Sequence, residues 1–154
     1  MIPATTSRVA MHTAPHINAR IRRQIDENVA HTAAAGPEAI ALRLAELDHE
    51  WDIERALEAN AASVTLLGLA LGAWVDRRWF LLPAVVGGFL LQHAVQGWCP
   101  PIPLFRRLGL RTQTEIDYER YALKALRGDF QGVAQQSDSR DRASARHTVE
   151  AAQR

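Results

Sequence analysis

Two long apolar runs stand out from an otherwise mixed sequence. The first covers residues 59–75 and the second covers residues 79–98, and only Asp76-Arg77-Arg78 separates them. Neither run contains an Asp, Glu, Lys or Arg. A core helix of a soluble protein normally meets water on one face, so uncharged runs of 17 and 20 residues favour two membrane-spanning helices joined by a tight turn.

The two runs differ in how strongly they favour a bilayer. At 1.5 Å per residue the first is roughly 25 Å long, which is short for a hydrocarbon core of about 30 Å. It also carries Asn60, Ser63 and Thr65 near one end. The second run is richer in large apolar side chains, and its Pro83 falls in the first turns, where proline is tolerated. We therefore predict a transmembrane hairpin over residues 59–99.

An amphipathic helical region is predicted before the hairpin, over residues 16–58. Apolar residues recur there at helical spacing, and Gly36-Pro37 separates two helices. No Gly or Pro separates the second of these helices from the first apolar run. That helix is expected either to continue into the span or to bend near residues 58–60.

After the hairpin, three prolines are expected to stop the helix, and a C-terminal helix follows within residues 100–130. Thr112 and Glu115 have the spacing of a capping box, which predicts a helix from about Gln113 to Arg127. The polar ends, residues 1–15 and 131–154, are expected to be disordered. The fold class predicted is all-α: a two-span transmembrane hairpin with amphipathic helices before and after it.

Charge and cysteine content exclude several classes of function. The net charge of +1 gives no field for nucleic-acid binding, and a single cysteine allows no internal disulfide. Residues 1–15 have no apolar core of the length that a signal peptide needs, so we expect the internal runs to direct membrane insertion. His12 and His16 are four residues apart, but we expect no metal site and no cofactor.

Small residues and arginines predict how the hairpin packs and how it is oriented. Close helix packing in membranes uses small residues, and these are Gly68, Gly72, Ala84 and Gly88. Folding at the turn brings Gly68 near residues 84–88, although the Gly68–Gly72 face could instead meet a second subunit.

Arginines are more frequent outside the hairpin than in its turn. The turn carries two, and the outer flanks carry Arg43, Arg55, Arg106, Arg107 and Arg111. Because positive residues favour the cytoplasmic side, both termini are expected in the cytoplasm of a bacterium, with the hairpin in its inner membrane.

The string Gly97-Trp98-Cys99-Pro100 follows the second run, and Leu104 and Gly109 come shortly after it. With the two apolar runs and the basic turn, this pattern over residues 50–112 resembles the YgaP-like inner-membrane transmembrane domain family. That resemblance implies a two-helix membrane domain without an assigned function. Some relatives also carry a rhodanese sulfurtransferase domain. Residues 1–58 are too short for one, have a helical pattern and lack cysteine, so that activity is not carried over.

Three residues near the end of the second run are candidate functional residues: Cys99, His93 and Trp98. Cys99 is a persulfide or thiol acceptor, a ligand for a soft metal shared between subunits, or a small residue buried at a helix end beside prolines. A helix C-terminus raises the pKa of a thiol and so disfavours the reactive thiolate. His93 is an ionisable residue at membrane depth. It either takes part in a proton or anion path, or pairs structurally with Asn60.

These features lead to three hypotheses. The first is a non-enzymatic accessory or scaffold protein that lies in the lipid bilayer and self-associates. The second is a sulfur-handling or small-anion transport component that uses Cys99 and His93 and works with a sulfurtransferase partner. The third is a soluble or peripheral helical bundle. We find no catalytic constellation in the sequence, and the acidic residues between Glu46 and Glu58 are expected to form a solvated helix face.

Overall fold

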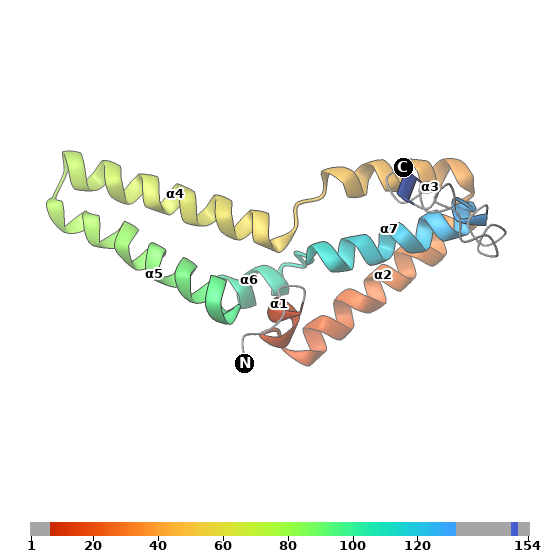
Figure 1. Ribbon diagram of the computed structural model, residues 1–154, viewed down its shortest axis with the longest axis horizontal. Helices are drawn as coiled ribbons and strands as arrows, with labels where there is room; N and C mark the ends of the chain where they lie inside the picture. The colour runs from red at the N-terminus through yellow and green to blue at the C-terminus, as the bar shows by residue number, and fades with distance from the viewer. Residues whose placement is uncertain (1–6, 132–148, 151–154) are drawn as a thin grey trace. The chain divides into compact units, whose positions relative to one another are not determined.

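A computed structural model describes residues 7–131 and 149–150. The chain forms helices at the following positions: α1 Arg8–Met11, α2 Pro15–Ala35, α3 Pro37–His49, α4 Ile53–Trp74, η1 Arg77–Phe80, α5 Leu81–Gln96, α6 Ile102–Arg107 and α7 Gln113–Arg127 (Figure 1). No strand occurs among the residues described. The prediction of an all-helical fold, with two long apolar helices and further helices on both sides, is confirmed.

The chain divides into two compact units. The first contains α1, the start of α2, α4, η1, α5 and α6. The second contains the rest of α2, α3 and nearly all of α7. The predicted disorder of the extreme ends falls largely on residues 1–6, 132–148 and 151–154, which lie outside the described residues. Within the predicted N-terminal disordered segment, residues 8–11 instead form α1.

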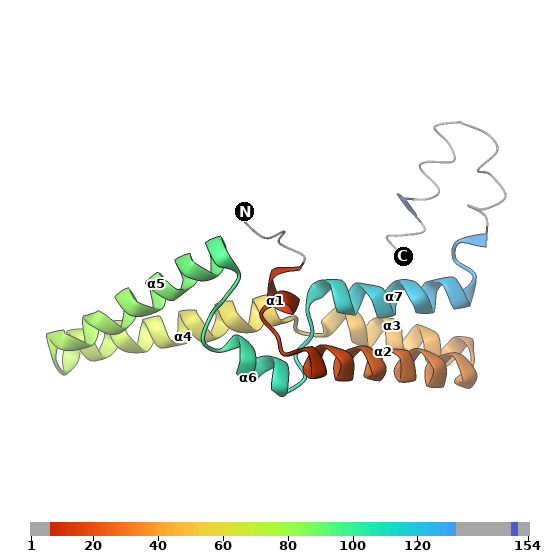
Figure 2. The same cartoon turned by 90° about the horizontal axis from the view of Figure 1, so that it is seen from below.

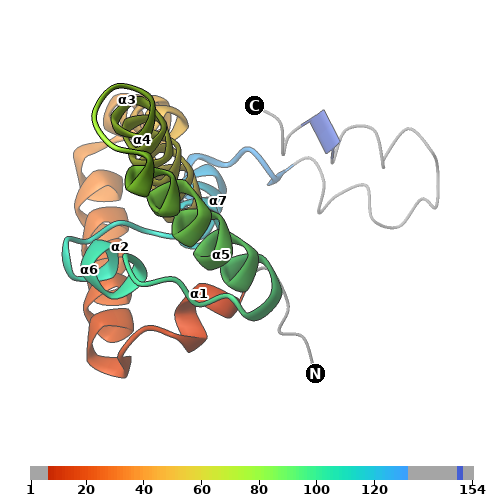
Figure 3. The same ribbon diagram turned by 90° about the vertical axis from the view of Figure 1, so that its left-hand side faces the viewer.

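The first unit is built on an antiparallel hairpin of α4 and α5. The two helices run side by side in Figures 1 and 2, and Figure 3 shows α5 inclined to α4. A short 3-10 helix, η1, closes the turn, and the Asp76 side chain accepts a hydrogen bond from the backbone N–H of Arg78 at 2.7 Å. The predicted turn therefore lies where the sequence pattern placed it.

Most of the apolar surface of the hairpin is not covered by the chain itself. In the most apolar 18-residue stretch within residues 37–74 only 22% of the residues are buried, and in that within residues 77–96 only 6% are. The large side chains left exposed are Leu66, Leu67, Leu69, Trp74, Val75, Trp79, Phe80, Leu81, Val85, Phe89, Leu90, Leu91 and Val95. A soluble core helix would bury such residues, so this surface fits contact with lipid tails.

The helix before the first span ends earlier than predicted. It neither continues into the span nor bends near residues 58–60: α3 ends at His49, and Glu50 has extended backbone angles. The reason is local, because the Asp52 side chain accepts a hydrogen bond from the backbone N–H of Arg55 at 2.9 Å and so caps a new helix. In addition, the N–H of Ile53 donates to the carbonyl of Arg111 at 2.8 Å.

A buried arginine holds the segment after the hairpin. Arg106, at the end of α6, is fully buried and donates to Asn18 Oδ1 at 2.9 Å and to the Leu110 carbonyl at 3.0 Å. Arg20 in turn donates to the carbonyl of Arg107 at 2.8 Å. The first turns of α2 are therefore attached to α6.

The second unit is a small helical bundle with its own core. Its buried residues come from α3 and α7, with Val29 of α2 packed against them, and they are Ile40, Leu44, Leu47, Ile116 and Leu123. Arg43 Nε donates to the fully buried carboxylate of Glu119 at 2.8 Å, and this hydrogen bond raises the pKa of Arg43. The predicted helix over residues 113–127 is confirmed with those bounds.

Candidate functional site at the polar end of the hairpin

An ion-pair cluster joins three helices of the first unit, where α4 begins and α5 ends. Glu54, in the first turn of α4, accepts a hydrogen bond from Arg8 Nη2 at 3.2 Å and one from His93 Nε2 at 2.7 Å. An acidic side chain is favourable at this position because the helix N-terminus carries a partial positive charge. The cluster therefore ties α1 and α5 to the start of α4.

His93 is bound differently from the sequence-based expectation. Its partner is the Glu54 carboxylate and not Asn60. The prediction from the hairpin count was wrong because α4 begins six residues before the apolar run, which makes Glu54 available to the end of α5. A charged acceptor also forms a stronger hydrogen bond than a neutral amide.

The pairing fixes the chemistry that His93 presents. A carboxylate only accepts, so Nε2 carries the proton and Nδ1 of the neutral ring is an acceptor. The His93 side chain is 9% exposed, and its Nδ1 is buried without a hydrogen-bond partner in the described part of the chain. The Glu54 carboxylate therefore fixes the orientation of the His93 ring and leaves Nδ1 as the ring nitrogen without a partner among the described residues.

The helix α1 covers the last turn of α5. His12 Nε2 donates to the carbonyl of Gln96 at 3.0 Å, which satisfies one of the free carbonyls at a helix C-terminus. Gly97 then ends α5 with φ +78, and a Cβ added at Gly97 would clash with the Cβ of Arg8. Gly97 is therefore required both for its backbone conformation and for the approach of α1.

Gly97→Ala should destabilise the first unit more than Gly109→Ala does. Both glycines have positive φ, so both substitutions carry a backbone cost on the order of 1–2 kcal/mol. Only at Gly97 does the new Cβ meet another residue; at Gly109 nothing lies within 4 Å. We expect Gly97→Ala to cost on the order of 1 kcal/mol more than Gly109→Ala. The excess stays this small because the short helix α1 can move away from the new Cβ, and this movement should reduce the protection of the α1 amides from exchange. Thermal unfolding and hydrogen exchange of the two variants measure the difference; equal behaviour would contradict the close approach.

Cys99 lies in a hydrophobic cluster and is not activated. It is 6% exposed and packs among Val9, Ile53, Leu57 and Ile102. Burial raises the pKa of the Cys99 thiol, because an apolar surrounding disfavours the thiolate. No hydrogen bond connects it to His93 within residues 7–131. The two candidate residues thus come from neighbouring segments but serve different clusters.

The alkylation of Cys99 should show this raised pKa directly. We expect its rate with iodoacetamide to rise with pH at values above those at which glutathione becomes reactive, since only the thiolate reacts. The same chain unfolded in dodecyl sulfate serves as the matched control, because it has the same single thiol without the burial. A folded-state profile that lies at lower pH than that of the unfolded chain would show an activated thiol.

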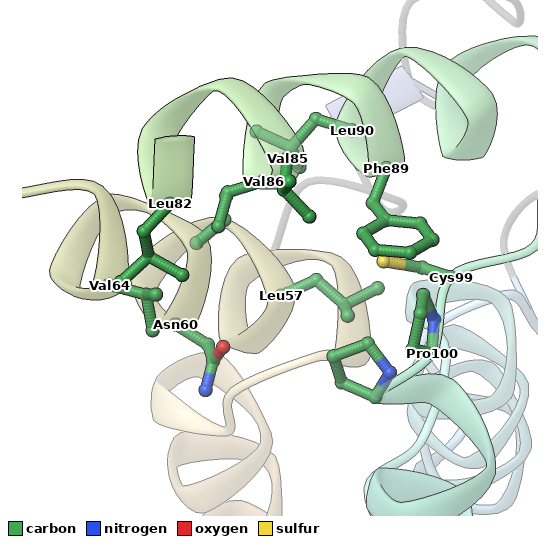
Figure 4. Close-up of a pocket in the computed structure, with 12 residues that line it drawn as sticks. Leu57, Asn60, Val64, Leu82, Val85, Val86, Phe89, Leu90, Cys99 and Pro100 are labelled. Carbon is green, nitrogen blue, oxygen red and sulfur yellow. The ribbon is translucent and has the colours of Figure 1, made fainter. Parts of the chain in front are cut away.

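An apolar cavity lies beside Cys99, between α4 and α5 (Figure 4). Its volume is about 240 Å³, and its lining includes Leu57 and Ala61 of α4, Val86 and Phe89 of α5, and residues 99–101 of the connection. Figure 4 shows the Cys99 sulfur beside the Phe89 ring and the Asn60 amide on the opposite side of the cavity. The site combines an apolar chamber with the Glu54–His93 cluster at the same end of the hairpin.

Trp98 has a packing role. Its ring meets Phe89 edge-on, with centroids 6.5 Å apart, which is a favourable aromatic geometry. Through Phe89 it supports one wall of the cavity.

The four predicted packing residues divide into an inner and an outer pair. A Cβ added at Gly68 would lie 2.6 Å from Pro83 Cδ, and one added at Gly72 would lie 2.7 Å from the Phe80 ring. Gly68 therefore contacts α5 at Leu82 and Pro83, just before the predicted residues 84–88. Ala84 is exposed, and nothing lies within 4 Å of a Cβ added at Gly88. The inner pair closes the hairpin, and the outer pair lies on its free surface.

Sequence reasoning missed Arg8, His12 and Glu54. Glu54 was counted with a solvated acidic face, and the other two were placed in a disordered segment. One local signal was available: Asp52 followed by an acidic residue two positions later is typical of a helix N-terminus. It would have located the start of α4, but not the partners of Glu54.

Comparison with known proteins agrees with this geometry. Residues 52–115 match the family described as inner membrane protein YgaP-like, transmembrane domain. No curated protein and no solved structure matches the chain significantly. The matched segment contains α4, η1, α5 and α6, with Glu54, His93 and Cys99. This segment of the chain therefore belongs to the YgaP-like transmembrane domain family of inner-membrane proteins.

Proposed function

We propose that this protein is a two-span, non-enzymatic accessory protein of the inner membrane that self-associates, with both termini in the cytoplasm. The observation that carries the proposal is the exposed apolar surface of the hairpin. At 1.5 Å per residue the 22-residue α4 is about 33 Å long. Its first two turns carry Glu54, Arg55 and Glu58 at the polar end, and its uncharged part of roughly 25 Å lies at the short end for a hydrocarbon core of about 30 Å. The stretch over residues 77–96 is 20 residues long.

Extraction of membranes with alkaline carbonate tests the spanning topology. The protein should stay in the pellet, as other integral proteins do, whereas release into the supernatant would favour the soluble or peripheral bundle. Leu90→Arg is a useful variant, because Leu90 is partly exposed on α5 and an arginine near the helix centre costs roughly 2.5–3.5 kcal/mol of insertion free energy. Its matched control is Leu104→Arg, which lies outside the hairpin on α6.

The distribution of arginines supports the orientation. Two arginines lie at the η1 end, and five lie on the outer flanks of the hairpin. A cysteine introduced as Trp79→Cys in a Cys99→Ser background should react with a membrane-impermeant maleimide added to spheroplasts. A cysteine introduced as Tyr118→Cys should react only after lysis. The opposite labelling pattern would reverse the proposed orientation.

Self-association is supported by the outer small residues of α5. Ala84 and Gly88 are four residues apart on an exposed face, the spacing at which membrane helices approach closely. We expect Gly88→Leu to reduce chemical cross-linking between copies in membranes. Ala94→Leu introduces the same side chain at another exposed position of α5 and should leave cross-linking unchanged. Equal cross-linking of both variants would place the interface elsewhere or remove it.

A sulfur-handling or small-anion transport role that uses Cys99 has weaker support. The thiol is buried, and its pKa is raised rather than lowered. Comparing cells that carry Cys99→Ser with wild type under sulfide or thiocyanate stress tests this second role. Unchanged growth would remove the case for it, while sensitivity of the variant alone would support a partner in sulfur chemistry.

A further inference from the structure

We propose that the cavity beside Cys99 holds a segment of one acyl chain of a membrane phospholipid. The cavity lies between α4 and α5, and its volume of about 240 Å³ exceeds that of an engineered 150 Å³ protein cavity that binds benzene. Its lining is almost entirely aliphatic and aromatic. A space of this size and character suits a slim, flexible hydrocarbon chain.

The source of the ligand follows from the position of the cavity. Val85, Phe89 and Leu90 line it and are also exposed on the outer surface of the hairpin. The cavity is therefore continuous with the surface that faces lipid tails. A chain from the surrounding bilayer can enter from the side without crossing water, and it would replace the missing contacts of the lining residues.

One polar side chain in the lining marks the place at which the lipid ester would lie. Asn60 lines the cavity, and its amide makes no hydrogen bond within the described part of the chain. It lies six residues beyond Glu54, or about 9 Å along the helix axis. Val64 and Leu82 line the cavity further towards η1. An ester carbonyl can accept a hydrogen bond from Asn60 while the hydrocarbon extends towards Val64 and Leu82.

Photo-cross-linking of the full chain in vesicles tests this proposal. The vesicles consist of phosphatidylethanolamine and phosphatidylglycerol with a trace of phosphatidylcholine that carries a diazirine in one acyl chain. After irradiation, mass spectrometry should find adducts on cavity-lining residues, several-fold enriched over outward residues such as Leu66 and Leu91. A diazirine near the ester should label near Asn60, and one several carbons further along the acyl chain should label near Val64 and Leu82.

Two filling variants provide the decisive comparison. Ala61→Leu adds bulk from the α4 wall and Val86→Phe adds bulk from the α5 wall, and each should reduce cavity adducts several-fold. Ala62→Leu and Leu91→Phe change exposed neighbours that do not line the cavity and should leave the adducts unchanged. Using both walls ensures that misfolding of one variant does not decide the result.

The outcomes separate this inference from the proposed topology on which it rests. Adducts on Leu66 and Leu91 alone, insensitive to the filling variants, would overturn the acyl-chain site and retain the spanning hairpin. Absence of adducts from the whole hairpin would overturn both. Cavity adducts that the filling variants abolish and the control variants retain would establish the lipid site.

Discussion

Glu54→Ala is expected to destabilise the first unit by about 2–3 kcal/mol. The substitution removes the common acceptor of Arg8 and His93, whose side chains are 17% and 9% exposed. Leaving a buried donor without its charged acceptor costs more folding free energy than losing an ordinary hydrogen bond. The estimate lies below the range for fully buried pairs because Glu54 is itself one-third exposed. Thermal or chemical unfolding in detergent, monitored by circular dichroism, measures the loss.

Glu58→Ala is the matched control for this prediction. It removes the same carboxylate from the same helix one turn later, at an exposed position without a side-chain hydrogen bond in the described part of the chain. Its effect should stay within about 0.5 kcal/mol. The double variant Glu54→Ala, His93→Ala should be more stable than additivity predicts, because the unpaired ring is removed as well. Equal effects of Glu54→Ala and Glu58→Ala would show that the cluster contributes nothing to stability.

Gly68→Val should open the hairpin. A Cβ at Gly68 would lie 2.6 Å from Pro83 Cδ and 3.1 Å from Leu82 Cβ, and the proline ring cannot rotate away. Overpacking of this kind costs roughly 1–3 kcal/mol, and here the simplest relief is separation of α4 from α5. We expect a longer distance between spin labels attached at the exposed positions Leu66 of α4 and Leu91 of α5, measured by electron paramagnetic resonance in a Cys99→Ser background.

Gly87→Val separates this steric effect from helix propensity. It introduces the same β-branched residue into an apolar helix of the hairpin, but nothing lies within 4 Å of the added Cβ. The label distance should then match that of the parent chain. If both valine variants show the same change, helix propensity and not close approach explains the role of Gly68.

Much of the fold could be predicted because apolar runs and turn residues are local signals. The two spans, the turn at residues 76–78 and the helix over residues 113–127 all follow from patterns in adjacent residues. The start of α4 was not predicted, although the Asp52 cap is a local signal for it. Residues 38–58 are helical in composition throughout, and the break depends on the Asp52 cap together with the hydrogen bond from Ile53 to Arg111. The second of these partners is distant in the sequence.

The candidate site was predicted only in part. Cys99, His93 and Trp98 could be selected because their residue types are unusual at the end of an apolar helix. Their contacts could not be predicted, since Glu54 and Arg8 lie 39 and 46 residues from their partners, His93 and Glu54. Burial of Cys99 likewise depends on Val9, from a segment that carries little local signal.

The contacts made by residues 8–20 decide which residues must be included when the hairpin is transferred to another protein. The family match begins at residue 52, yet Arg8 neutralises Glu54, His12 completes the end of α5 and Asn18 accepts a hydrogen bond from the buried Arg106. A fusion or excision made at the edge of the matched segment would remove all three. The transplantable unit in this chain is therefore discontinuous, and residues 7–22 must accompany the hairpin for it to keep its base intact.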